Sequence, residues 1–180
     1  MLPFCRYEKV FENSYFDRIV NDVPFTQNKI LSSGIWVDEP RKTCWMSDND
    51  VTLEYSDKTM KPIRMSKSIE EIRDKLNSEF NIYYDSVLVN LYPDGGAGMR
   101  YHSDPIDNKW DTNFMIVSFG AIRKIVFRDI KNFDNKYAFD FNDGDCINMF
   151  DDCQDLYQHS IRKDKHIKDP RVSLVFKISK

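Results

Sequence analysis

The spacing of apolar residues changes to a period of two after residue 85, and this change constrains the fold more than any other feature of the chain. Apolar and polar residues alternate through a series of short segments, which predicts about seven strands. No helical pattern separates these segments, so a sandwich, barrel or jelly roll is favoured over a parallel α/β fold. The predicted strands are 85–92, 113–120, 123–128, 137–141, 146–150, 159–162 and 172–178.

Helices and hairpins are predicted before these strands. Residues 68–80 carry a one-sided apolar stripe, and Ser68 and Glu71 form an S-x-x-E capping box at its start. Between this helix and an earlier one, glycine, proline and an Asp/Asn-rich run in residues 25–65 favour hairpins and loops. The earlier amphipathic helix is indicated by apolar residues at helical spacing, namely Phe11, Tyr15, Ile19 and Val20.

Length and composition predict one globular domain. The chain has 180 residues, an ordinary size for a single domain, so residues 1–180 are expected to form one unit. Within it, residues 1–65 would supply an N-terminal helix and a substrate lid, and residues 66–180 a supporting helix and the β core. Hydrophobic residues make up 41% of the chain, which excludes intrinsic disorder. The net charge of −3 argues against a wholly basic nucleic-acid coat, although a local basic groove fits it.

Cysteine usage and hydropathy predict a soluble, intracellular protein of the nucleus or cytoplasm. Cys5, Cys44, Cys146 and Cys153 form no C-x-x-C pair, and we expect reduced, mostly structural thiols. The longest apolar stretch, 114–122, is nine residues long, whereas a membrane helix needs about 20. We therefore expect no membrane association, and we expect a monomer.

The last predicted strand has two chemically different faces. Side chains alternate across a strand, so Arg171, Ser173 and Lys177 share one face while the other face is apolar. An earlier strand repeats this pattern with Asn90 and Tyr92. These polar faces are either half-exposed surface or, if both point inward, the walls of a pocket for a small dianion.

Three residues have the spacing of a metal site. His102 and Asp104 form an H-x-D pair, and Pro105 disfavours a helix there, so both side chains are expected on one side of an extended segment. An H-x-D pair alone also occurs by chance. His159, at the start of a later strand, completes the two-His, one-carboxylate set of non-haem Fe(II) oxygenases. His166 lies in a charged loop, where we expect it to be solvated.

Several ordered motifs resemble the AlkB family of Fe(II)- and 2-oxoglutarate-dependent dioxygenases. They are N-L-Y-P-D-G at 90–95, H-S-D at 102–104, S-F-G-A-I-R-K-I-V-F-R at 118–128, and His159 followed twelve residues later by R-V-S-L-V-F-K at 171–177. The similarity runs from about residue 40 to residue 178. Family members that repair alkylated DNA are most alike, because Pro40-Arg41-Lys42 and a following acidic hairpin resemble their nucleotide-recognition lid.

The resemblance implies a mainly β fold, a double-stranded β-helix (jelly-roll) core with an N-terminal helix and hairpin lid. It also implies Fe(II) as the metal, with 2-oxoglutarate and O₂ as cosubstrates. The implied iron ligands are His102, Asp104 and His159.

The implied cosubstrate contacts lie on the two polar strand faces. Arg171, with Tyr92 and Ser173, would hold the distal carboxylate of 2-oxoglutarate, while Asn90 and Lys177 would lie near its metal-chelating end. Lys177 departs from the family pattern because many members have a second arginine there. A planar, bidentate group is thereby replaced by a point charge.

The implied substrate contacts depart from the pattern of the repair enzymes at two positions, where Leu53 replaces a lid aromatic and Ile106 an acidic residue. Tyr55 would stack on the extruded base, and the cations would contact phosphates. These implied contacts are Arg41, Lys42, Tyr55 and Arg128.

The implied reaction is oxidative demethylation of N-alkylated bases of the 1-methyladenine and 3-methylcytosine type. DNA is the expected polymer, with RNA as an alternative, and 2-oxoglutarate decarboxylation would accompany formaldehyde release. Single strands should be preferred over duplexes, because Ser32-Ser33-Gly34 replaces the apolar wedge with which a duplex-repairing member opens the base stack. A wedge from a shifted hairpin remains the alternative, with Ile30, Leu31 or Ile35 in that place.

Two other functions fit parts of the same pattern. The enzyme could hydroxylate or demethylate protein instead of a base, although Pro40-Arg41-Lys42 and Tyr55 favour nucleic acid. A non-catalytic reader of alkylated bases is the third hypothesis. The intact metal triad argues against a reader, which has no need for iron and 2-oxoglutarate sites together.

Overall fold

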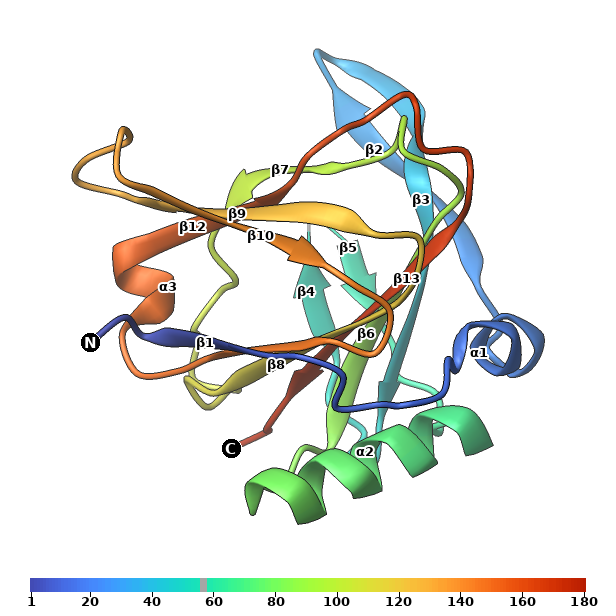
Figure 1. The fold of residues 1–180 in the computed structure, drawn as a ribbon. Coiled ribbons are helices and arrows are strands. Elements are labelled where there is room, and N and C mark those ends of the chain that lie inside the picture. Colours follow the sequence, from blue (N-terminus) through green and yellow to red (C-terminus); the bar gives the residue numbers. More distant parts are fainter. Residues whose placement is uncertain (56–57) are drawn as a thin grey trace.

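The computed structural model describes residues 1–55 and 58–180, and in this part of the chain two antiparallel sheets face each other (Figure 1). The side chain of Tyr55 also lies outside the described part. The larger sheet contains, in spatial order, β1 (Phe4–Tyr7), β11 (Cys146–Met149), β8 (Phe114–Gly120), β13 (Arg171–Lys177), β6 (Ser86–Tyr92), β3 (Ile35–Ser47) and β2 (Thr26–Ser32). The smaller sheet contains β10 (Lys136–Phe141), β9 (Arg123–Asp129), β12 (Tyr157–Ile161) and β7 (Met99–His102). A separate two-stranded ribbon is formed by β4 (Leu53–Tyr55) and β5 (Lys58–Met60).

Helices flank the sheets within the described residues. α1 (Phe16–Asp22) and α2 (Lys67–Phe80) pack on the outer face of the larger sheet, and α3 (Cys153–Leu156) directly precedes β12 (Figure 1). Two opposed antiparallel sheets with strands alternating between them form a jelly roll, so the predicted fold class is confirmed. None of these helices is long and apolar enough to cross a membrane. All four cysteines are free thiols, as expected.

The period-two pattern located the strands well. Each of the predicted strands is present, with ends within two residues of the expected ones. The structure adds β7 to the smaller sheet and three N-terminal strands to the larger one. Among these, β3 is 13 residues long and lies between β2 and β6, so the N-terminal region helps to build the main sheet.

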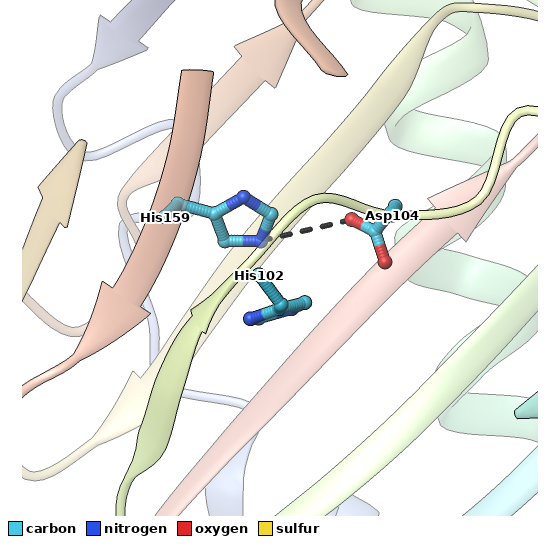
Figure 2. Close-up of side chains that lie close together, drawn as sticks. All are labelled: His102, Asp104 and His159. Carbon is cyan, nitrogen blue, oxygen red and sulfur yellow. Dashed lines mark ion pairs between the residues drawn. The ribbon is translucent and has the colours of Figure 1, made fainter. Parts of the chain in front are cut away.

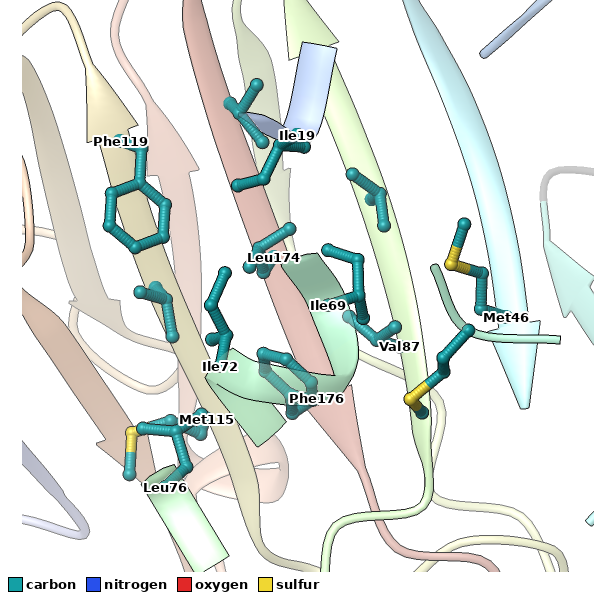
Figure 3. Packing of buried hydrophobic residues seen from close by; sticks show 14 of the residues in the cluster. Ile19, Met46, Ile69, Ile72, Leu76, Val87, Met115, Phe119, Leu174 and Phe176 are labelled. Atoms are coloured by element: carbon teal, nitrogen blue, oxygen red, sulfur yellow. The ribbon is translucent and has the colours of Figure 1, made fainter. Parts of the chain in front are cut away.

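A first hydrophobic core lies between the larger sheet and the two longer helices (Figure 3). Ile69, Ile72 and Leu76 recur on one face of α2 and have no exposed surface. They pack against the apolar face of β13, represented by Leu174 and Phe176. Fully burying side chains of this size stabilises the fold by about 1.5–3 kcal/mol each.

The first predicted helix is shorter than its apolar spacing indicated. α1 begins at Phe16, so Phe11 and Tyr15 precede it, and Val20 is partly exposed. Phe11 nevertheless reaches the core through a loop, because its amide donates to the carbonyl of Gly144. Gly144 has φ +82, and a Cβ there would lie 2.2 Å from the Phe11 carbonyl oxygen, so only glycine allows this approach.

The predicted capping box of α2 is wrong in detail. The N-cap is Ser66 rather than Ser68, and Glu71 pairs with Arg18 of α1 at 2.7 Å. The start of the helix is capped from a distance instead, since the carboxylate of Asp22 accepts hydrogen bonds from the Ser68 amide and hydroxyl at 2.9 and 2.7 Å. A cap from another helix cannot be read from local spacing.

The polar face of β13 points inward, between the two sheets. Arg171, Ser173 and Lys177 are 0%, 5% and 2% exposed, and Asn90 and Tyr92 of the neighbouring β6 are 3% exposed. The alternative of a half-exposed surface strand is therefore wrong. An apolar core fills the rest of the space between the sheets, and these polar groups interrupt it.

Candidate metal centre and substrate groove

Three side chains converge between the sheets (Figure 2). His102 ends β7, Asp104 follows two residues later, and His159 lies in β12 directly opposite His102. One potential ligand atom from each lies within 4.8 Å of the others. Nε2 of His159 is 3.6 Å from Oδ2 of Asp104, and the two imidazole centroids are 4.3 Å apart. Strand pairing thus brings the two histidines together, and the segment after β7 adds Asp104, which completes the set that the H-x-D spacing and the distal histidine singled out.

The protonation states of these groups suit a metal ion. Nδ1 of His102 lies 2.8 Å from the carbonyl oxygen of Arg100, which only accepts, so Nδ1 carries a proton and Nε2 is the nitrogen left to bind a metal. Burial and the nearby His102 lower the pKa of His159 well below its usual value. Burial opposes ionisation of Asp104, but the nearby Lys177 above all, with smaller contributions from the two imidazoles and Arg41, lowers the pKa of Asp104 to about 2. Neutral imidazoles and an ionised carboxylate are the metal-binding forms.

Two buried atoms at the triad lack hydrogen-bond partners within the described part of the chain, and they fit a bound cation and a bound anion. Among the described residues, Oδ2 of Asp104 and Nζ of Lys177 have no hydrogen-bond partner. Nζ of Lys177 lies 3.8 Å from Oδ1 of Asp104, which is too long for a hydrogen bond. Two imidazole nitrogens and one carboxylate, leaving further positions open, form the donor set of non-haem Fe(II) centres. The residues present therefore fit iron.

The polar strand faces form a pocket next to the triad. Arg171 lies opposite Tyr92 in the strand register, and Ser173 opposite Asn90. Nε of Arg171 donates to the Ser118 hydroxyl at 2.8 Å, whereas Nη1 and Nη2 have no partner among the described residues. Burial lowers the pKa of Arg171 to about 10, so it remains charged at neutral pH. The guanidinium lies beside Tyr92, which lines the pocket, 5.4 Å from the ring centroid, and its two unused donors suit a carboxylate.

A family model described as the 2OG-Fe(II) oxygenase superfamily matches residues 11–177 of the chain. The chain belongs to this superfamily. Its members use Fe(II), 2-oxoglutarate and O₂, and the triad and the adjacent cationic pocket have the chemistry to hold the metal and the dicarboxylate. The structure also resembles OsALKBH1, with a TM-score of 0.65 and 12% identity over 99% of both chains, which supports the fold.

Relatives within the 2OG-Fe(II) oxygenases confirm the resemblance to AlkB. Uncharacterized protein R406 of Acanthamoeba polyphaga mimivirus is 28% identical over 97% of this chain and 93% of its own length. DNA oxidative demethylase ALKBH2 of Bos taurus is 28% identical, covering 96% of this chain and 68% of that protein. The alpha-ketoglutarate-dependent dioxygenase alkB homolog 3 of Bos taurus is 25% identical over 92% of this chain. The present chain spans 60% of that protein's length.

A groove of about 650 Å³ adjoins the metal pocket of this oxygenase. Arg41 lines both the groove and the metal pocket, and it is 3% exposed. Its Nη2 is 3.0 Å from Oε1 of Glu39, whose other oxygen is 2.8 Å from Nζ of Lys58. Its Nη1 donates to Sδ of Met99 at 3.3 Å. The groove wall nearest the metal is thus a fixed, positively charged cluster.

The other predicted substrate residues lie in different places. Lys42 is exposed on β3, where alternation turns it away from Arg41. Arg128 lies between two rings, 3.9 Å from the Tyr101 centroid and 4.2 Å from that of Phe133, and bonds the Gln158 amide oxygen. Tyr55 ends β4, and its side chain lies outside the described residues. Of the three whose side chains the structure describes, only Arg41 lines the metal pocket.

Sequence reasoning missed Glu39, the buried acid that holds Arg41. A period-two reading could have found it, because Glu39 and Arg41 are two residues apart on one strand and so share a face. Its pairing with Lys58 has no local signal, since that residue lies in another strand. The exposed His166 lies apart from the triad in the 162–169 loop, as predicted for a solvated residue.

Proposed function

We propose that this oxygenase removes N-linked alkyl groups from nucleobases, of the 1-methyladenine and 3-methylcytosine type, with DNA as its main polymer. The proposal rests on three features that lie next to one another: the triad, a buried arginine and a groove. The His-Asp-His triad lies in a pocket that Tyr92 and Ser173 also line, and the buried Arg171, whose terminal nitrogens have no partner among the described residues, lies against Tyr92. Arg41 lines both this pocket and a cationic groove. The chain's similarity to ALKBH2 and alkB homolog 3 supports the choice of reaction.

Each part of the site has a proposed task. His102, Asp104 and His159 would hold Fe(II), which with 2-oxoglutarate and O₂ supplies the oxidising power to hydroxylate the alkyl carbon, after which formaldehyde leaves. Arg171, with Tyr92 and Ser173, binds the distal carboxylate of 2-oxoglutarate. Asn90 and Lys177 face its metal-chelating end.

The groove would receive an unstacked nucleotide. An alkyl group on a base edge reaches the metal only when the base leaves the stack. Arg41 would then contact the base or its phosphate where groove and metal pocket meet. Tyr55, Lys42 and Arg128 remain proposed contacts to the base and the flanking strand.

Single strands are the proposed preferred substrate. The β2–β3 hairpin turns through Ser33 and Gly34, with φ +50 and +80, so no apolar wedge stands at its tip. Trp36, 59% exposed on the flank of this hairpin, can stack on an unpaired base. Leu31 and Ile35 are 54% and 66% exposed beside it, and either of them or the half-buried Ile30 is the alternative wedge.

The reaction class is tested by measuring formaldehyde from matched substrates. Oligonucleotides with 3-methylcytosine should release formaldehyde in the presence of Fe(II) and 2-oxoglutarate, and N-methylated peptides should not. His102→Ala should abolish release and His166→Ala should retain it, because only the first residue belongs to the triad. Release from peptides alone would establish the protein-directed alternative. Tight binding of methylated oligonucleotide without release would establish the reader.

Strand preference is tested with one 3-methylcytosine oligonucleotide, alone and annealed to its complement. The single strand should react faster, and Trp36→Ala should slow that reaction, with a loss equivalent to about 1–3 kcal/mol of base stacking. Tyr83→Ala is the matched control, because Tyr83 is also an exposed aromatic, at 77%, but lies outside the β2–β3 hairpin that carries Trp36. Equal or faster reaction of the duplex would refute the preference and favour the Leu31 and Ile35 wedge.

A further inference from the structure

One triad residue lacks the support that the other two receive from the sheet. His102 and His159 lie in paired strands, whereas Asp104 lies in the irregular segment 103–107. Its carboxylate is 3.6 Å from His159 and 3.8 Å from Lys177, beyond hydrogen-bond distance in both cases. The direction of the Asp104 side chain therefore depends on how its backbone is held.

A buried amide holds that backbone. The Asp104 N–H donates to Oε1 of Gln154 at 2.8 Å, across 50 residues of sequence. Gln154 is 4% exposed and lies in α3, and its Nε2 donates to Sδ of Met149 at 3.3 Å, which orients the amide. The hydroxyl of the preceding Ser103 donates to the Tyr157 carbonyl at 3.0 Å. Residues 154–157, which lead into the strand of His159, thus hold residues 103–104 through two hydrogen bonds.

We propose that Gln154 is a positioning residue for the metal centre. This inference rests on the proposed iron ligands, and it adds a residue that touches neither metal nor substrate. By fixing the Asp104 backbone relative to β12, Gln154 sets the distance between the carboxylate and the imidazole of His159. Partners that orient metal ligands in this way commonly change metal affinity by about 10- to 100-fold when they are removed.

The test compares two near-isosteric substitutions in the full chain stripped of metal. Gln154→Met keeps the length of the side chain but replaces the amide oxygen with a thioether sulfur, a much weaker acceptor for the Asp104 amide. Gln154→Glu keeps an acceptor oxygen in the same place, and its added negative charge is compatible with a bound cation. Co(II) is titrated without 2-oxoglutarate or nucleic acid, and its visible absorption reports affinity and ligand geometry.

The expected order of Co(II) affinities distinguishes a positioning role of Gln154 from a general effect on stability. Gln154→Met should bind Co(II) about 10- to 100-fold more weakly and with a changed spectrum, and Gln154→Glu should recover most of the affinity. Tyr84→Phe is the control, because it removes a partly buried hydrogen bond to Asn113, 2.8 Å long, away from the triad. It should lower the melting temperature without changing Co(II) affinity.

Each contrary result has a distinct meaning. Unchanged affinity of Gln154→Met, or equal losses in the Met, Glu and Tyr84→Phe variants, would overturn the role of Gln154. If Gln154→Met does not fold, Gln154→Asn takes its place, since it keeps an amide but withdraws the acceptor by one methylene. Failure of the unaltered protein to bind Co(II) would instead refute the metal centre itself.

Discussion

Replacing Arg171 with methionine should remove 2-oxoglutarate binding without unfolding the protein. Arg171 is fully buried, and both of its terminal nitrogens lack partners among the described residues. Two hydrogen bonds to a carboxylate, each worth about 1.5–3 kcal/mol when one partner is charged, give a loss of about 3–6 kcal/mol. The dissociation constant of 2-oxoglutarate should therefore rise roughly 10²- to 10⁴-fold.

The same substitution should leave the ligand-free protein about as stable as before. A buried cation with unused donors is costly, and apolar replacement of buried charges is often neutral or stabilising by about 1–4 kcal/mol. The lost bond from Nε to the Ser118 hydroxyl, worth about 1 kcal/mol, offsets part of that gain. Ser118→Ala measures this bond separately.

The assay is calorimetric titration of 2-oxoglutarate into Mn(II)-loaded protein, with thermal unfolding of the metal-free variants beside it. Arg171→Lys should bind with intermediate affinity, because it keeps the charge and loses the two-pronged geometry. Unchanged 2-oxoglutarate affinity in Arg171→Met would show that the polar strand faces are not the cosubstrate site. A collapse of stability in the ligand-free variant would contradict the argument about uncompensated charge.

Two further predictions concern single side chains. Lys177→Arg should keep 2-oxoglutarate turnover but lower the free energy of unfolding by about 1–3 kcal/mol through overpacking. The reason is that Nζ lies 3.9 Å from the centroid of the fully buried Phe114 ring. An unchanged denaturation midpoint would contradict this prediction. Asp145 accepts hydrogen bonds from Arg6 and the Lys9 amide, and although burial opposes it, these contacts lower the pKa of Asp145. The ionised Asp145 should stabilise the fold fully above its unfolded pKa, about 3.9, and this stabilisation should be lost as the pH falls through the folded pKa. The difference in unfolding free energy between Asp145→Asn and wild type, measured with urea, should therefore be smaller at pH 3 than at pH 7.

The parts of the fold that depend on local pattern could be predicted from the sequence. Alternation of apolar residues located the strands after residue 85, because side-chain direction alternates with each residue of a strand. The same alternation separated Arg171 from Leu174, and it predicted the polar face without showing that this face is buried. The H-x-D spacing and the distal histidine indicated the triad, and family resemblance indicated the metal.

What could not be predicted depends on contacts between distant segments. Asp22 caps a helix that begins 45 residues later, and Gln154 holds Asp104 across 50 residues. Neither residue stands out in its own surroundings. The sequence predicted only an extended segment where β7 lies. The strand is short and pairs with β12 through a shift in register, so it has no regular alternation to mark it. Such features become visible only when the strands are placed beside each other.

The most direct test of dealkylation is a mass balance on one defined lesion. A single-stranded oligonucleotide with one 3-methylcytosine is incubated with the protein, Fe(II), 2-oxoglutarate and O₂, and the oligonucleotide, succinate and formaldehyde are quantified by mass spectrometry. We predict that the oligonucleotide loses one CH₂ unit, with formaldehyde formed in equal amount and at least as much succinate, and that His159→Ala shows none of these changes. Succinate formation with the methylated base left intact, under conditions where the oligonucleotide is bound, would contradict the proposal.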